Sequence, residues 1–152
     1  MAVARYVSPP IALPRPGTAY RRADLHFYGV DHSGSSFEAR VFLNHPDADA
    51  ATPREAGAGY AGSFYIFGHG GCFGDAGHCD VPPGPRRPYD RRLPHQLTPQ
   101  HKLVVVTEAL RRLEGGGATA MTVTVVPVAS DSPVPADERL LRFRQLSLLL
   151  YD

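Results

Sequence analysis

Apolar and polar residues alternate along two early segments of the chain, which is typical of strands with one buried face. In residues 21–30, the apolar face is formed by Ala23, Leu25 and Phe27, and the polar face by Asp24, His26 and Tyr28. In residues 36–43, the apolar positions are Phe37, Ala39, Val41 and Leu43. The turn sequence DHSGS separates the two segments. The pattern therefore predicts a hairpin in which they pair, with His26 facing solvent.

Four more strands and one helix are predicted further along. The strands are expected over residues 60–67, 102–106, 119–128 and 140–151, where apolar and β-branched residues gather. Between the second and third of these, Thr107 is a candidate helix cap, with Glu108 in the first turn and the glycines at 115–117 ending the helix. The two longest stretches without periodicity are residues 44–59 and the Gly-, Pro- and Cys-rich residues 72–101.

Six strands, long connections and one short helix predict an all-β fold, an antiparallel β-sandwich of jelly-roll-like form. The chain has 152 residues, which suits one domain with a real core. Residues 1–20 are rich in proline and are expected to form an extended arm. Residues 21–152 are expected to form the single sandwich domain.

The overall charge bears on the partners of the protein. The net charge is +1, so there is no electrostatic reason to expect nucleic acid or a membrane as a partner. No apolar run reaches membrane-spanning length, and the first residues lack the apolar core of a signal peptide. We therefore expect a cytoplasmic location, or export together with a partner.

The densest group of reactive side chains follows the strand at residues 60–67. It consists of His69, Cys72, His78 and Cys79. Thiolates with imidazoles suit Cu(I), and zinc is the alternative metal. The other interpretations are a Cys72–Cys79 disulfide that pins a Gly-rich loop, and a redox-active thiol pair. Reducing conditions in the cytoplasm make the disulfide the less expected state there.

Three segments resemble a known family when they are taken in order: SFEARVFLN (residues 36–44), YAGSFYIFGH (60–69) and LVVVTEALRRLEGGGATAMTVTVVPV (103–128). They are similar to the C-terminal β-sandwich domain of plant-type polyphenol oxidases. More loosely, they resemble the sandwich domains of tyrosinases and molluscan haemocyanins. The resemblance covers residues 22–151, with Ser36 at the position of the lysine in the family's signature.

The resemblance implies a role beside a copper enzyme. In that family the sandwich packs on a helical domain that holds two coppers, and one of its side chains often blocks the copper entrance. Tyr65 and Phe67 are the candidates for such a plug; the alternative is that they are ordinary core aromatics.

The histidines bear on whether the chain is itself catalytic. A binuclear copper site needs six imidazoles on paired helices, whereas the seven histidines of this chain include no HxxxH pair. We therefore expect no catalytic residues here, and any oxidoreductase activity to come through a partner. The sequence thus predicts a non-catalytic partner of a tyrosinase-like copper oxidase, acting in active-site shielding, folding or copper loading. The alternatives are a stand-alone copper- or zinc-binding protein, and a small metalloenzyme or redox domain.

Overall fold

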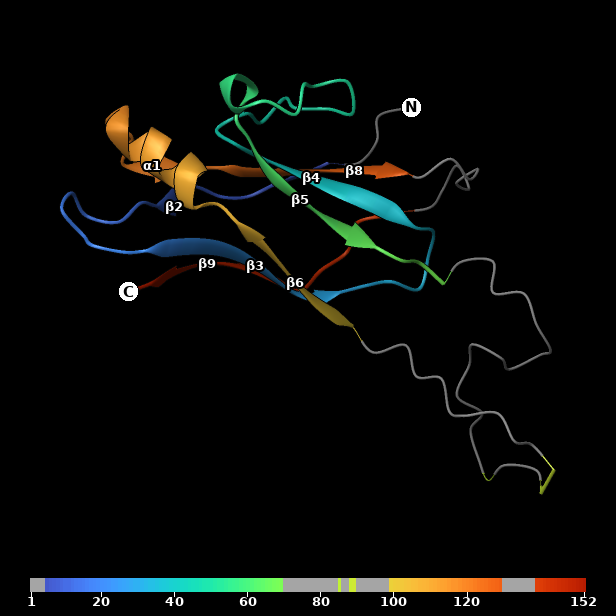
Figure 1. Ribbon diagram of the computed structural model, residues 1–152. Helices are drawn as coiled ribbons and strands as arrows, with labels where there is room; N and C mark the ends of the chain where they lie inside the picture. Colours follow the sequence, from blue (N-terminus) through green and yellow to red (C-terminus); the bar gives the residue numbers. More distant parts are fainter. Residues whose placement is uncertain (1–4, 70–84, 86–87, 90–98, 130–138) are drawn as a thin grey trace.

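Two antiparallel sheets face each other across an apolar core in the computed structural model of the chain (Figure 1). The structure describes residues 5–69, 85, 88–89, 99–129 and 139–152. Within them the strands are β1 (Tyr6–Val7), β2 (Ile11–Ala12), β3 (Arg22–Val30), β4 (Phe37–Leu43), β5 (Tyr60–Ile66), β6 (Gln100–Val105), β7 (Ala120–Met121), β8 (Val123–Ala129) and β9 (Gln145–Tyr151). The helices are the 3-10 helix η1 (Ala56–Ala58) and the α-helix α1 (Thr107–Gly115).

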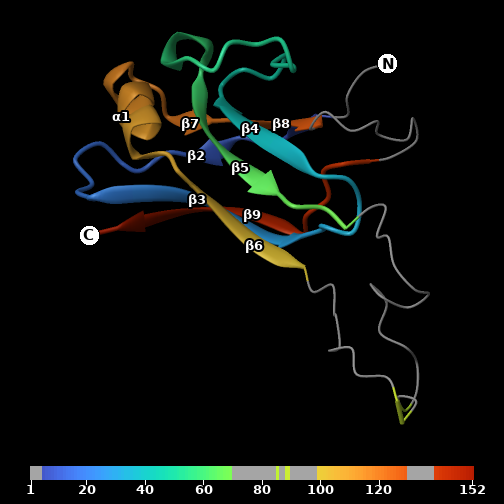
Figure 2. The same cartoon turned by 45° about the vertical axis from the view of Figure 1, so that its right-hand side comes forward.

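The strand order confirms the all-β sandwich. One sheet has the order β1-β8-β4-β5 and the other β6-β3-β9, while β2 and β7 form a small ribbon. Every pairing is antiparallel. Figure 2 shows α1 at one end of the sandwich, above the ends of β3 and β9 in this view.

The predicted hairpin between residues 21–30 and 36–43 is wrong. β3 pairs with β6 and β9, whereas β4 pairs with β5 and β8. The turn at residues 31–36 therefore carries the chain from one sheet to the other. Both strands point an apolar face into the shared core, and alternation reveals that buried face but not the neighbouring strand.

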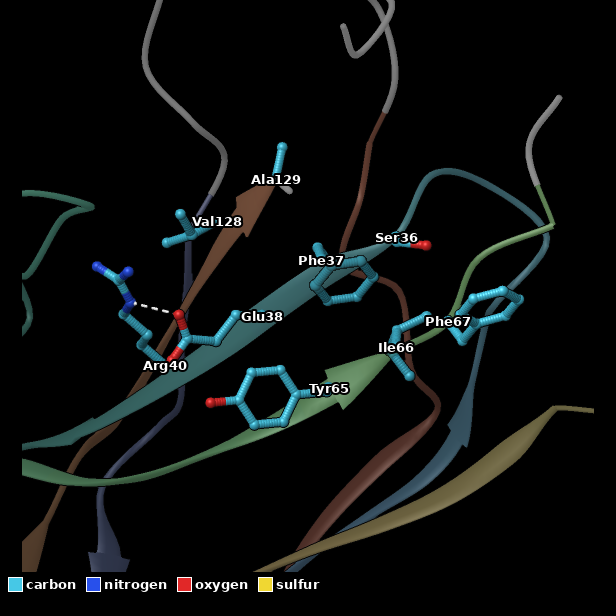
Figure 3. Close-up of a pocket in the computed structure, with 9 residues that line it drawn as sticks. All are labelled: Ser36, Phe37, Glu38, Arg40, Tyr65, Ile66, Phe67, Val128 and Ala129. Carbon is cyan, nitrogen blue, oxygen red and sulfur yellow. Dashed lines mark hydrogen bonds and ion pairs between the residues drawn. The ribbon is translucent and has the colours of Figure 1, made fainter. Parts of the chain in front are cut away.

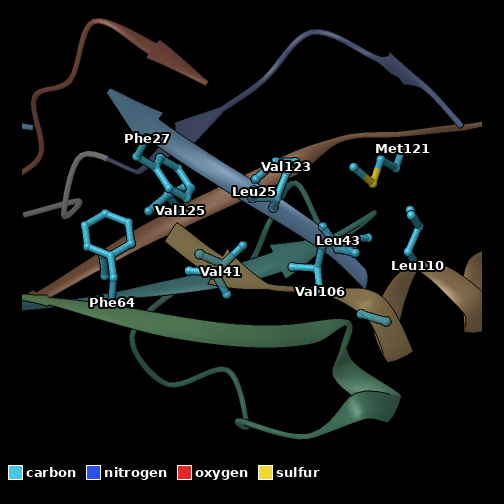
Figure 4. Packing of buried hydrophobic residues seen from close by; sticks show 14 of the residues in the cluster. Leu25, Phe27, Val41, Leu43, Phe64, Val106, Leu110, Met121, Val123 and Val125 are labelled. Carbon is cyan, nitrogen blue, oxygen red and sulfur yellow. The ribbon is translucent and has the colours of Figure 1, made fainter. Parts of the chain in front are cut away.

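The core lies between the apolar faces of β3, β4, β5 and β8 (Figure 4). The predicted inward residues of β3 and β4 are all buried. The Phe27 and Phe64 rings, from opposite sheets, lie 4.8 Å apart at their centroids. At the helical end, Leu110 of α1 and Met121 of β7 close the core. Fully burying one such side chain stabilises a fold by about 1.5–3 kcal/mol.

The helix is confirmed, but its predicted cap is not. The helix begins at Thr107, and Val106 holds the N-cap position without a side-chain hydrogen bond. The Thr107 hydroxyl instead accepts a hydrogen bond from the backbone N–H of Ala23 at 3.0 Å. The contact anchors the first turn of α1 to the central strand β3.

Two predicted strands are shorter than expected. The run at residues 119–128 is interrupted at Thr122, whose backbone exchanges hydrogen bonds with Asn44. The last strand begins at Gln145 rather than at residue 140, because the residues before it make contacts outside the β3–β9 ladder. Leu141 turns into the core, and the Arg142 carbonyl accepts a hydrogen bond from Asp31 N–H.

The sandwich is closed along one side by a close approach of β5 and β6. Gly62 of β5 has a φ of 145°, and a Cβ there would lie 2.6 Å from Cγ1 of Val104. Only glycine permits both this backbone conformation and this distance. On the opposite side the sheets end in β1 and β9. No helix in the described residues is long and apolar enough to cross a bilayer.

Candidate functional site

Two large aromatic side chains stand exposed where β5 ends. Tyr65 is 62% exposed and Phe67 is 79% exposed. The alternative that they are core aromatics is therefore wrong. Phe64 and Ile66 take the inward positions of β5, so Tyr65 projects from the outer face of the sheet. Ser63 lies two residues before Tyr65 and therefore on the same face of the strand, and its polarity was the sequence signal for this orientation.

An open groove lies beside these aromatics on the outer face of the β1-β8-β4-β5 sheet (Figure 3). Its volume is about 540 Å³. It is lined by Ser36, Phe37, Glu38, Arg40, Tyr65, Ile66, Phe67, Val128 and Ala129. A neighbouring part of this face is covered by the connection at residues 44–59, from which Ala48 packs against Phe42 and Val126. The groove lies next to this covered part.

A carboxylate fixes the polar wall of the groove. Glu38 accepts hydrogen bonds from Arg40 Nε at 2.9 Å and Ser63 Oγ at 2.8 Å, and it pairs with Arg54 at 3.2 Å. Burial raises the pKa of Glu38, but the bonds from Ser63 and Arg40 outweigh it and hold the pKa below its usual value. The ionised carboxylate therefore orders the wall next to Tyr65.

Of the predicted metal ligands, only His69 lies within the described residues. Its backbone N–H donates to the His32 carbonyl at 2.9 Å, and the two imidazole centroids lie 4.9 Å apart. Cys72, His78 and Cys79 lie outside the described residues, so both the metal site and the disulfide stay predictions. Among the residues that the structure describes, no three His, Cys, Asp or Glu side chains gather to hold a metal.

A second histidine pair lies on the outer face of the β6-β3-β9 sheet, and the sequence did not predict it. His26 is only 6% exposed, so the expectation that it faces solvent is wrong. Its Nδ1 lies 2.8 Å from Nε2 of His101, and its Nε2 lies 3.0 Å from the Tyr151 hydroxyl. His101, expected in a loop, belongs to β6. Because β3 is the middle strand, side chains from both neighbours cover even its outward residues.

Comparison with known proteins identifies the fold. No protein-family model matches the chain, and no curated protein matches it either. Among solved structures, it resembles "Recombinantly expressed latent aurone synthase (polyphenol oxidase)" with a TM-score of 0.58 and 16% identity, over 98% of this chain and 25% of that one. "Latent aurone synthase (polyphenol oxidase) from natural source" gives a TM-score of 0.56 and 17% identity, over 97% and 24%. The chain therefore shares the fold of about a quarter of these polyphenol oxidase chains, as the sequence resemblance implied.

Proposed function

We propose that the chain is a non-catalytic β-sandwich partner of a tyrosinase-like copper oxidase, and that it shields the entrance to the oxidase's active site. The observation that carries this proposal is the exposed pair Tyr65 and Phe67 beside the groove. The likeness to part of the polyphenol oxidase chains supports the choice of partner.

The chemistry of the pair suits a concave, aromatic-binding partner. Exposed aromatic side chains gain most when they enter a pocket that excludes water, and such residues dominate binding energy at interfaces. The Tyr65 phenol is the same chemical group as a monophenol substrate, so it would compete with substrate for a phenol-binding site. Beside it, the ordered Glu38–Arg40 pair would supply polar contacts at the margin.

The proposal is tested by mixing the full chain with a tyrosinase-like oxidase from the same organism that lacks a sandwich domain. Catechol oxidation should slow as the chain is added. The double variant Tyr65→Ala with Phe67→Ala should restore most of the rate. Tyr89, another exposed tyrosine, provides the matched control Tyr89→Ala, which should inhibit like the original chain. An oxidase rate that is unchanged by the chain would refute shielding.

Copper loading is a second candidate, favoured by the position of His69. The His69 imidazole lies next to that of His32. In the sequence, His69 shortly precedes Cys72, His78 and Cys79. A Cu(I) or zinc site there would use His69 with the two thiolates and His78. Because thiolates must lose protons to bind metal, affinity should fall as the pH is lowered.

Metal titration of the isolated chain separates this candidate from its alternatives. One equivalent of Cu(I) or zinc, lost in the double variant Cys72→Ser with Cys79→Ser, would support a metal site. A stand-alone metal-binding protein would bind without affecting an oxidase. A titration of native thiols that counts none would instead indicate the Cys72–Cys79 disulfide. A small metalloenzyme or redox domain would require turnover by the isolated, metal-loaded chain.

A further inference from the structure

The last strand, β9, forms a long open margin of the β6-β3-β9 sheet (Figures 1 and 2). It pairs with β3 on one side only. Among the residues that the structure describes, no backbone group bonds to its other side. An open strand edge presents unpaired N–H and carbonyl groups that can pair with another extended segment.

The geometry fixes which residues present these groups. Val106 N–H donates to the Ala23 carbonyl, so the backbone of Ala23 points toward β6. Successive residues of a strand point their backbone groups in opposite directions. Asp24 and its even-numbered neighbours therefore point toward β9, where Asp24 lies opposite Leu149. It follows that the backbone groups of Leu146, Leu148 and Leu150 point outward from β9.

β9 lacks the features that normally protect such an edge. Its sequence, QLSLLLY, contains no charge, proline or glycine. Leu149 and Leu150 are each 37% exposed, and Tyr151 is 41% exposed. The other three edge strands have such features. β1 is only two residues long, β6 carries Lys102, and β5 carries Gly62 beside a register irregularity. Natural sheets use short strands, charges and irregularities of this kind to prevent edge pairing.

The residues that flank β9 indicate which extended segment pairs with its open edge. Arg144 precedes the uncharged run and Asp152 follows it, and both are exposed. In an antiparallel pair of two β9 strands centred on Leu148, Arg144 of each copy comes to the same end of the pair as Asp152 of the other. Arg144 precedes the strand, with its N–H on the Tyr28 carbonyl, but its exposed side chain carries the charge opposite to that of Asp152, so the two attract. Parallel pairing, or another centre, would not match these charges.

We propose that two copies of this chain pair through β9 in an antiparallel, two-fold symmetric dimer. Leu148 exchanges backbone hydrogen bonds with the second copy's Leu148, and Leu146 does so with the second copy's Leu150. This register uses the outward backbone groups, since its centre falls on a residue that presents them. The two three-stranded sheets become one continuous sheet, and the exposed Leu150 packs against the second copy's Leu146.

The first test measures the mass of the full chain by sedimentation velocity at concentrations from micromolar to millimolar. A monomer–dimer equilibrium is expected. Leu148→Pro removes an outward N–H without removing a bond to β3, and it should leave a monomer. Amide hydrogen exchange gives a readout independent of that variant: exchange at Leu146, Leu148 and Leu150 should slow as the concentration rises. A monomer at every concentration would overturn the proposal.

A charge exchange tests the pairing itself, in case the proline variant fails to fold. Arg144→Asp brings two acidic side chains together at each end of the pair, so the dissociation constant should rise about tenfold. Adding Asp152→Arg should restore the original affinity. Arg112→Asp, an exposed change of the same charge on α1, which packs against β3 and β5, is the matched control and should have no effect. If Arg144→Asp left the dissociation constant of the dimer unchanged, the interface would lie elsewhere.

Discussion

His26 Nδ1 and His101 Nε2 lie 2.8 Å apart across β3 and β6, although the two residues are 75 positions apart in sequence. Only one of the two nitrogens can carry the shared hydrogen, so the contact fixes one tautomer of each ring relative to the other. With the Tyr151 hydroxyl on its other side, His26 links all three strands of the sheet.

Replacement of His26 should therefore destabilise the fold. His26→Ala removes a buried ring that contacts both neighbouring strands, which should lower the free energy of unfolding by about 1–3 kcal/mol. His101→Ala is the control; because His101 is exposed, water can replace it and the loss should be smaller. Urea denaturation measures both. Equal losses for the two variants would contradict the central position of His26.

Gly62 should tolerate no side chain. Gly62→Ala places a Cβ against Val104 at a positive φ, and it should lower the free energy of unfolding by about 1–3 kcal/mol. Gly57→Ala has open space around the new Cβ and serves as the control. The measurement is thermal or urea unfolding. If Gly62→Ala were as stable as the original chain, β5 and β6 would not approach as closely as described.

Glu38 should contribute to the acid sensitivity of the protein. Despite its burial, hydrogen bonds from Ser63 and Arg40 lower the pKa of Glu38 in the folded state. Its contribution to stability is thus complete above the ordinary carboxyl pKa and is lost as the pH falls through the lowered one. Glu38→Gln should be less stable at neutral pH and should show a flatter loss of stability below about pH 5.

The control for this experiment is Glu108→Gln, on the exposed face of α1. Unfolding is followed by urea denaturation at a series of pH values. The control should keep the acid sensitivity of the original chain. An unchanged slope in Glu38→Gln would mean that other carboxylates, such as Asp31, whose pKa is also lowered by Ser33 and Arg142 against the effect of burial, account for all of it.

Thr124 offers a stabilising substitution. Its hydroxyl is buried and has no hydrogen-bond partner within the described residues. Thr124→Val keeps the shape and removes the unpaired polar atom, so the free energy of unfolding should rise by about 1 kcal/mol. Thr119→Val, at an exposed position, should change little. A loss of stability in Thr124→Val would indicate that the hydroxyl has a partner.

The sequence predicted where strands occur better than how they pair. Two-residue alternation located β3 and β4 because one face of each strand lies in the core. Alternation could not distinguish a hairpin, in which β3 and β4 pair, from a connection that crosses between the two sheets, since both arrangements put Leu25 and Val41 in the same core. The central position of β3 also explains why His26 was misplaced, because polarity indicates a solvent face only where no neighbouring strand covers it.

In the candidate site, two-residue alternation along β5 would have placed Tyr65 on the outer face of the sheet. The groove, in contrast, depends on contacts between residues remote in sequence. Tyr65 shares its face with Ser63, which is visible in the sequence. The groove also needs Glu38 of β4 and Val128 of β8, which only the strand order brings together. The metal hypothesis for His69 with Cys72, His78 and Cys79 stays a prediction for the titration described above.

The order of strands in the β6-β3-β9 sheet has a consequence for synthesis on the ribosome. β3 is made early, yet its two neighbours begin at Gln100 and Gln145. Both edges of β3 are unpaired until β6 leaves the exit tunnel, and the edge that pairs with β9 stays unpaired until β9 follows, so this sheet cannot be completed ahead of the last strand. Assembly therefore waits for the last strand and must close long loops, which makes it slow compared with that of a helical protein. During this interval the nascent chain exposes a strand that needs protection from aggregation.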